Sequence, residues 1–202
     1  MHYPGRTAVL LGLLFGLAGT STSAVTVALP QLSGDLGITT ATAAWIVSAY
    51  TVALAVATPL HGRLADMAGI RLPLTLGVAA MGVGAVAAAL APNFPALILA
   101  RVLQGVGSAS IPVLATALIS AHFSGAAQGA ALGRVAGVAA TLSALGPLIG
   151  GGLEAVGGWR WAVALPVVGM LAIPVLWRVA PTGGSGEPID KVGALLVALA
   201  AS

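Results

Sequence analysis

The sequence predicts an all-α polytopic membrane protein: a six-helix bundle of two inverted three-helix repeats, followed by the start of a seventh helix. Of its 202 residues, 58% are hydrophobic and only 6% are charged, whereas an average soluble domain carries about 25% charged residues. So few charges could not cover the surface of a water-soluble chain, and the mean hydropathy of +1.05 agrees with a hydrocarbon environment. Six apolar stretches each supply the roughly 20 residues that a spanning helix requires.

The six stretches follow one another with short breaks between them. The first covers residues 7–29, and Pro30 is expected to end it because proline removes a helical hydrogen bond. The others cover residues 41–60, 72–91, 94–122, 127–153 and 159–179. A cleaved signal peptide is the alternative for the first stretch, but the five that follow favour a spanning helix. Residues 1–180 are therefore predicted to form one transmembrane bundle.

The end of the chain differs in composition from the bundle. Residues 181–191 are polar and rich in Gly and Pro, which predicts a linker. Residues 192–202 are apolar but too few to span, so they are predicted to begin the seventh helix.

The distribution of basic residues predicts the orientation, because cytoplasmic loops carry an excess of Lys and Arg. If the amino terminus is cytoplasmic, most basic residues fall on the cytoplasmic side: Arg6, Arg63, Arg71, Arg134, Arg178 and Lys191. Only Arg160 falls outside, and Arg101 lies within the fourth stretch. We therefore expect a multi-pass protein of the plasma membrane with a cytoplasmic amino terminus and a cytoplasmic linker at 181–191.

Composition excludes several classes of function. Eight basic residues are too sparse for a nucleic-acid footprint, and the absence of cysteine excludes thiolate chemistry. His2, His61 and His122 are isolated, so no metal site is expected. The spans contain no paired aspartates, no Ser–His pair and no H-E-x-x-H motif, so we expect neither an enzyme nor a cofactor. A channel stays possible, although no filter motif is visible.

A short pattern occurs twice in the chain. Residues 62–71 and 151–160 both fit G-x-L-x(4)-G-x-R, with an offset of 89 residues (151 − 62). Three predicted helices separate the two copies, so the copies lie on opposite sides of the membrane. An inverted repeat of three-helix units predicts this arrangement; a coincidental match in a glycine-rich chain is the alternative.

Three groups of residues stand out as candidate functional positions. In segment 62–71, Gly62 and Gly69 permit a tight turn, and Asp66 can pair with Arg71 or accept hydrogen bonds at a helix amino terminus. An ordinary capped turn is the alternative reading. Arg101 is the only charge well inside a span, where charges are expensive and usually face a partner or an aqueous cavity.

Gln104 lies one turn beyond Arg101 on the same helical face. The alternative for Arg101 is that its side chain extends to the outer membrane surface. The fifth stretch contains Gly133, Gly146, Pro147, Gly150 and Gly151. These small residues predict close helix packing, and a generic packing face is the simplest reading.

These motifs resemble the major facilitator superfamily along essentially the whole chain. Segment 62–71 is similar to the family's G-x-L-a-D-r-x-G-r-[kr] signature, although Met67 and Ile70 replace basic residues. In the family this loop latches the two halves of the transporter, which implies a conformational latch at Gly62, Asp66, Gly69 and Arg71. Residues 101–109 are similar to R-x-x-q-G-x-g-x-a, whose arginine is tied in the family to proton coupling.

The fifth stretch resembles the family's antiporter motif, G-x(8)-G-x(3)-G-P-x(2)-G-G, with Leu142 where one glycine is expected. Residues 21–30 resemble L-D-x-T-x-x-N-x-A-L-P of the fourteen-helix drug:proton antiporter branch, with Ser21 in place of the aspartate and Thr26 in place of the asparagine. Trp45 and Tyr50 also occupy positions typical of that branch. Residues 189–195 are similar to the start of its seventh helix.

The resemblance implies the amino-terminal half of a secondary transporter, with proton-coupled efflux of drug-like amphipathic compounds by alternating access. Its expected partners are the lipid bilayer, a small-molecule substrate and the missing carboxy-terminal half, with the proton gradient as energy source. Candidate cavity residues are Ser21, Thr26, Trp45, Tyr50, Arg101 and Gln104. Because no carboxylate lies in mid-membrane, coupling requires the other half, or the protein is an uncoupled facilitator. A truncated product without transport activity is the further alternative.

Overall fold

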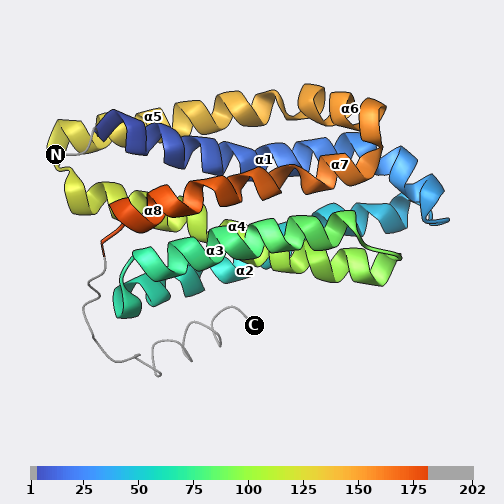
Figure 1. Ribbon diagram of the computed structural model, residues 1–202, viewed down its shortest axis with the longest axis horizontal. Helices are drawn as coiled ribbons and strands as arrows, with labels where there is room; N and C mark the ends of the chain where they lie inside the picture. The colour runs from blue at the N-terminus through green and yellow to red at the C-terminus, as the bar shows by residue number, and fades with distance from the viewer. Residues whose placement is uncertain (1–3, 182–202) are drawn as a thin grey trace.

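The computed structural model describes residues 4–181, and every regular element in that part of the chain is a helix (Figure 1). The first four are α1 (Pro4–Asp35), α2 (Thr40–Ala68), α3 (Arg71–Ala89) and α4 (Phe94–His122). They are followed by α5 (Gly125–Ala144), α6 (Gly146–Gly157), α7 (Trp159–Ala164), the 3₁₀ helix η1 (Leu165–Ala172) and α8 (Ile173–Val179).

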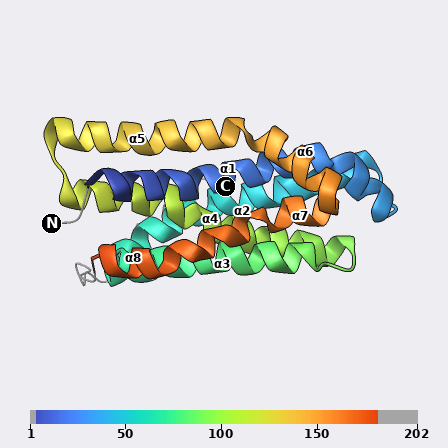
Figure 2. The ribbon, with the colours of Figure 1, turned by 45° about the horizontal axis from the view of Figure 1, so that its top comes forward.

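These elements form six membrane-spanning units. Helices α1 to α4 are each one span, and α5 and α6 form one span with a bend of 42° between them. The sixth span, Trp159–Val179, comprises α7, η1 and α8. Successive units run back and forth along the long axis of the molecule (Figure 2). The predicted six-helix bundle is thus confirmed, whereas the predicted seventh helix and all of the linker except Pro181 lie outside the described residues.

The prediction that Pro30 ends the first helix is wrong, because α1 continues to Asp35 with Pro30 inside it. Contacts with the start of α7 hold this last part of α1. The backbone N–H of Trp159 donates to Gln31 Oε1 at 2.8 Å, and its indole N–H donates to Asp35 Oδ2 at 2.9 Å. These tertiary bonds keep the turn helical after a residue that lacks a donor of its own.

The predicted range of the second helix, residues 41–60, is also shorter than the observed one. Helix α2 extends to Ala68, so Gly62 and Asp66 lie in its last turns, and only Gly69 and Ile70 connect it to α3. The glycine at position 62 therefore does not form part of a turn.

Two glycines at equivalent positions of the sequence repeat end helices in the same way. Gly69 has φ 77° and ψ 172°, and Gly158, 89 residues later (158 − 69), has φ 73° and ψ −178°. Each N–H donates to the carbonyl four residues earlier, that of Ala65 or Glu154. The two turns lie at opposite ends of the bundle (Figure 1), as an inverted repeat requires.

We expect Gly69→Ala and Gly158→Ala each to lower stability by about 1–3 kcal/mol, because this backbone region is essentially restricted to glycine. The measurement is thermal unfolding of the purified protein in detergent. Gly152→Ala is the matched control, since it lies within α6 and a Cβ there would meet nothing within 4 Å. Equal stability of all three variants would contradict the assigned turn geometry.

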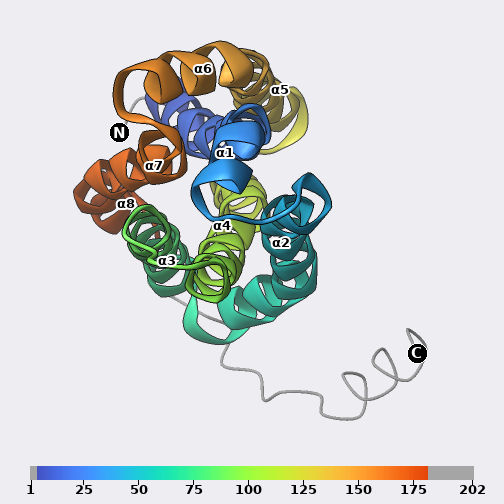
Figure 3. The same ribbon diagram turned by 90° about the vertical axis from the view of Figure 1, so that its right-hand side faces the viewer.

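Helices α1 and α4 lie at the centre of the bundle, and the other helices surround them (Figure 3). Glycines permit the closest approaches. A Cβ at Gly105 would overlap the Tyr50 carbonyl oxygen of α2, and one at Gly84 of α3 would come within 2.6 Å of the Gln104 backbone nitrogen. Helix α4 is therefore tightly enclosed by α2 and α3, which buries the middle of α4.

Candidate functional site

A buried polar cluster lies where α1, α2 and α4 meet. Arg101 and Gln104 of α4 and Ser21 of α1 are each 0% exposed, and Tyr50 of α2 is 3% exposed. Four of the six predicted cavity residues thus come together. Each lies in the interior of its helix, so the cluster is a group of polar side chains buried within the bundle.

Arg101 is the centre of this cluster. Its Nε donates to the carbonyl of Ile46 at 3.2 Å, and its Nη1 donates to Gln104 Oε1 at 2.5 Å and to Ser21 Oγ at 3.3 Å. The guanidinium carbon also lies 4.3 Å from the centre of the Tyr50 ring, a favourable cation–π distance. Arg101 therefore connects three helices and does not extend to the membrane surface.

Two donors of the cluster have no acceptor. Among the described residues, neither Arg101 Nη2 nor Gln104 Nε2 makes a hydrogen bond, although both atoms are buried. Buried polar groups are nearly always paired, so such donors need an explanation.

Further hydroxyl groups, absent from the sequence prediction, surround Tyr50. The Tyr50 hydroxyl donates to the Ala18 carbonyl at 3.3 Å, and the side chains of Thr22 and Ser108 lie beside it. Ser108 also donates to the carbonyl of Gln104 at 2.8 Å. Its spacing of four residues from Gln104, on the same face of α4, was the signal that could have identified it.

The structure does not bring Thr26 and Trp45 into the cluster. Thr26 is exposed on α1, where its hydroxyl donates to the Thr22 carbonyl at 2.8 Å. Trp45 is 63% exposed and lines an apolar groove of about 430 Å³ between α2 and α4. Both side chains therefore lie on the surface of the bundle, away from the buried cluster.

Arg71, one of the predicted latch residues, contacts the end of the sixth span. Its Nε donates to the Ala180 carbonyl at 2.8 Å, its backbone N–H donates to the Pro181 carbonyl at 3.2 Å, and its guanidinium lies 5.6 Å from the Trp177 ring centre. Arg71 thus binds the end of the sixth span to the start of the third. Asp66 and Gly62 lie in the last turns of α2, and Gly69 forms the turn that follows.

The glycines of the predicted antiporter motif differ in their roles. A Cβ at Gly146 would come within 2.6 Å of Ser23 Cβ, and one at Gly150 would come within 2.6 Å of Ala24 Cβ, so both pack against α1. Gly133 faces open space, and Gly151 has only Val27 nearby, at 3.9 Å. The expectation of close packing is therefore wrong for Gly133.

The bend of this span falls next to the motif. It lies between α5 and α6, where Gly146 and Pro147 begin α6. Close packing at Leu142, where the motif expects glycine, is preserved by the opposite helix. A Cβ at Gly16 of α1 would come within 2.7 Å of Leu142 Cβ, and Thr20 of α1 donates to the Leu142 carbonyl at 2.8 Å.

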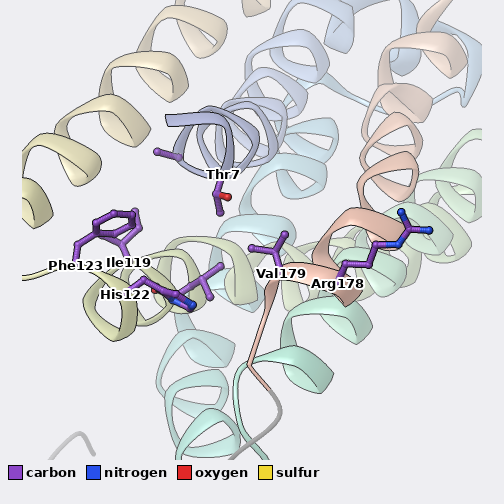
Figure 4. A pocket seen from close by; sticks show the side chains of 8 residues that line it. Thr7, Ile119, His122, Phe123, Arg178 and Val179 are labelled. Carbon is purple, nitrogen blue, oxygen red and sulfur yellow. The ribbon is translucent and has the colours of Figure 1, made fainter. Parts of the chain in front are cut away.

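A separate cavity of about 190 Å³ lies at the end of the bundle where α1 begins and α4 and α8 end (Figure 4). Apolar side chains form most of its wall, with Thr7, His122 and Arg178 adding polar groups. His122 is on the same helix as Arg101 but almost six turns away. This cavity is therefore distinct from the buried cluster.

The fold and the cluster define a polytopic helical membrane protein with a buried cation at the meeting point of three spans. Residues 11–200 match the family model of the Major Facilitator Superfamily. The chain belongs to this superfamily.

Three relatives are similar in sequence to most of this chain. It is 37% identical over 164 residues to the efflux pump dotC of Dothistroma septosporum, which covers 80% of this chain and 28% of dotC. It is 33% identical over 194 residues to the lincomycin resistance protein of Streptomyces lincolnensis, which covers 94% of this chain and 40% of that protein. The puromycin resistance protein pur8 of Streptomyces alboniger is 35% identical over 189 residues, covering 91% of this chain and 37% of pur8. The chain thus spans well under half the length of these relatives.

Solved structures show the same fold. A peptide transporter POT superposes with a TM-score of 0.77 at 18% identity, covering 98% of this chain and 45% of that one. A bacterial homologue of the human lysosomal transporter Spinster gives 0.75 at 20% identity, covering 96% and 49%. At this identity the likeness establishes the fold of the bundle alone.

Proposed function

We propose that this chain is the amino-terminal half of a secondary active transporter that expels drug-like amphipathic compounds. The observation that carries the proposal is the fully buried Arg101, bonded to groups from three spans. Ionisable residues inside a membrane are costly and typically mark a substrate or ion pathway. The names of the relatives, an efflux pump and two antibiotic resistance proteins, favour export as the direction of transport.

Alternating access in this proposal requires a second bundle, which the remaining length of the relatives would supply. The face of α1 and α4 between α2 and α5 is the surface proposed to receive it (Figure 3). Apolar grooves flank this face. One lies between α2 and α4 and includes Trp45. The other has a volume of about 480 Å³, lies between α1 and α5 and includes Val9 and Leu142.

The proton gradient is the proposed energy source. The acids of the described residues are Asp35, Asp66 and Glu154, and all three lie in the last turns of helices. A proton-carrying carboxylate in mid-membrane would therefore belong to the second bundle. An uncoupled facilitator is the alternative if that bundle also lacks one.

The proposed location is the plasma membrane, with the amino terminus in the cytoplasm. One end of the bundle contains the start of α1, the α2–α3 and α4–α5 connections and the end of α8 (Figure 1). Arg6, Arg63, Arg71 and Arg178 lie in these segments or in the helix turns next to them, so the positive-inside rule favours this end as the cytoplasmic one.

Transport by everted membrane vesicles tests the proposal. Vesicles containing the full-length protein are expected to accumulate a substrate from a panel that includes lincomycin and puromycin, and to lose it when the pH gradient is dissipated. Equilibration without accumulation would support the uncoupled facilitator. We expect no transport by residues 1–202 alone, and undiminished transport by them would contradict the two-bundle mechanism.

A further inference from the structure

We propose that the buried cluster of Arg101, Gln104 and Ser21 binds a small monovalent anion of the size of chloride. The ion site lies inside the bundle and does not depend on the direction or the substrate of transport. The charge of the cluster, its unpaired donors and its enclosure all favour an anion.

The charge of Arg101 has no partner of opposite sign in the described structure. Its hydrogen-bond acceptors are the Ile46 carbonyl, the Ser21 hydroxyl and the Gln104 amide, all of them neutral. The Tyr50 ring adds a cation–π contact but no net charge. No carboxylate of the described residues interacts electrostatically with Arg101. An isolated buried charge is strongly unfavourable, so a counter-ion would stabilise the folded bundle.

The unpaired atoms of the cluster are all of one kind. Arg101 Nη2 and Gln104 Nε2 are both N–H donors, both are buried, and neither has an acceptor among the described residues. They belong to side chains that are joined by the bond from Arg101 Nη1 to Gln104 Oε1. That bond orients the Gln104 amide so that its oxygen is occupied and its NH₂ group is available. A guanidinium and an amide that both offer donors select an anion and repel a cation.

Enclosure limits the size of the anion. Arg101, Gln104 and Ser21 are each 0% exposed, and α1, α2 and α4 surround them. A carboxylate attached to a drug-like compound could not reach the donors without separating these helices, whereas a monatomic ion needs little space. The Ser21 hydroxyl, 3.3 Å from Arg101 Nη1, is the third group available to such an ion, because a hydroxyl hydrogen can rotate toward an acceptor.

The position of Ser21 provides a matched pair of variants. Ser21→Asp places a carboxylate beside Arg101 and so supplies a counter-ion within the chain, whereas Ser21→Asn has nearly the same shape and no charge. We expect chloride to stabilise the wild type and the Ser21→Asn variant but not the Ser21→Asp variant. Arg134→Gln, which removes an exposed arginine of α5, should respond to chloride as the wild type does.

The experiment is thermal unfolding of the purified protein in detergent, in sodium chloride and in sodium gluconate at equal ionic strength. Gluconate is the control because it is too large for an enclosed site. At chloride concentrations about 100-fold above the dissociation constant, the midpoint is expected to rise by about 5–10 °C. Equal midpoints of the wild type in the two salts would overturn the proposal and leave bound water as the partner of the two donors. An undiminished chloride effect in Ser21→Asp would overturn it too.

A second measurement keeps the test independent of the folding of any variant. Chloride NMR of the wild-type protein is expected to show line broadening that bromide reverses by competition. Broadening that a carboxylate-bearing substrate removes, while bromide does not, would assign the site to the transported compound and contradict an inorganic anion.

Discussion

Transport by the full-length protein is expected to fall about 100-fold when Arg101 is replaced by glutamine. The change removes the bonds to Ile46 of α2 and Ser21 of α1 and the cation–π contact with Tyr50. A hydrogen bond to a charged group contributes about 1.5–3 kcal/mol, and about 2.8 kcal/mol corresponds to a factor of 100. If these contacts change during the transport cycle, the loss appears in the rate.

A stability measurement separates this functional role from a structural one. Removing a buried charge without a counter-ion also removes its desolvation penalty, so the unfolding midpoint in gluconate is expected to stay near that of the wild type. Initial rates of uptake into everted vesicles measure the functional loss, and Arg160→Gln, which changes an exposed arginine, is the control. Wild-type rates in Arg101→Gln would exclude the cluster from the transport mechanism.

Gly107→Ala is expected to cause the largest loss of stability among single-methyl additions to the bundle. A Cβ at this position would overlap the backbone nitrogen of Met81 and lie 2.5 Å from the Gly77 carbonyl oxygen, both in α3. Backbone atoms cannot rotate away, so α3 and α4 must separate. We expect a destabilisation at or above the roughly 1–3 kcal/mol typical of overpacked cores.

Thermal unfolding in detergent tests this expectation together with a matched control. Gly129→Ala adds the same methyl group to α5, where a Cβ would meet nothing within 4 Å. Because alanine favours helix more than glycine, by up to about 1 kcal/mol, the control is expected to be neutral or stabilising. Similar midpoints for the two variants would show that α3 and α4 are not in the close contact described here.

Helical spacing explains which predicted cavity residues came together. Ser21 and Thr26 are five residues apart on α1, and Trp45 and Tyr50 are five apart on α2. At about 100° per residue, five residues correspond to a rotation of about 140° around the helix axis. The two residues of each pair therefore face different ways. Ser21 and Tyr50 face the inside of the bundle, whereas Thr26 and Trp45 face outward. This spacing was present in the sequence and could have divided the candidates.

The sequence by itself determined that the chain lies in a membrane, how many spans it has, and that glycine forms the two turns of the sequence repeat. Long apolar stretches with few charges can be stable only in hydrocarbon, and the backbone of Gly69 and Gly158 requires glycine. The lengths of α1 and α2 and the membership of the buried cluster were decided only by the tertiary structure. The end of α1 depends on bonds from Trp159, 128 residues after Gln31, and Arg101 meets Ser21 across 80 residues of sequence. Spacing along one helix shows which residues share a face, but which face turns inward and how closely two helices approach each other depend on contacts between helices.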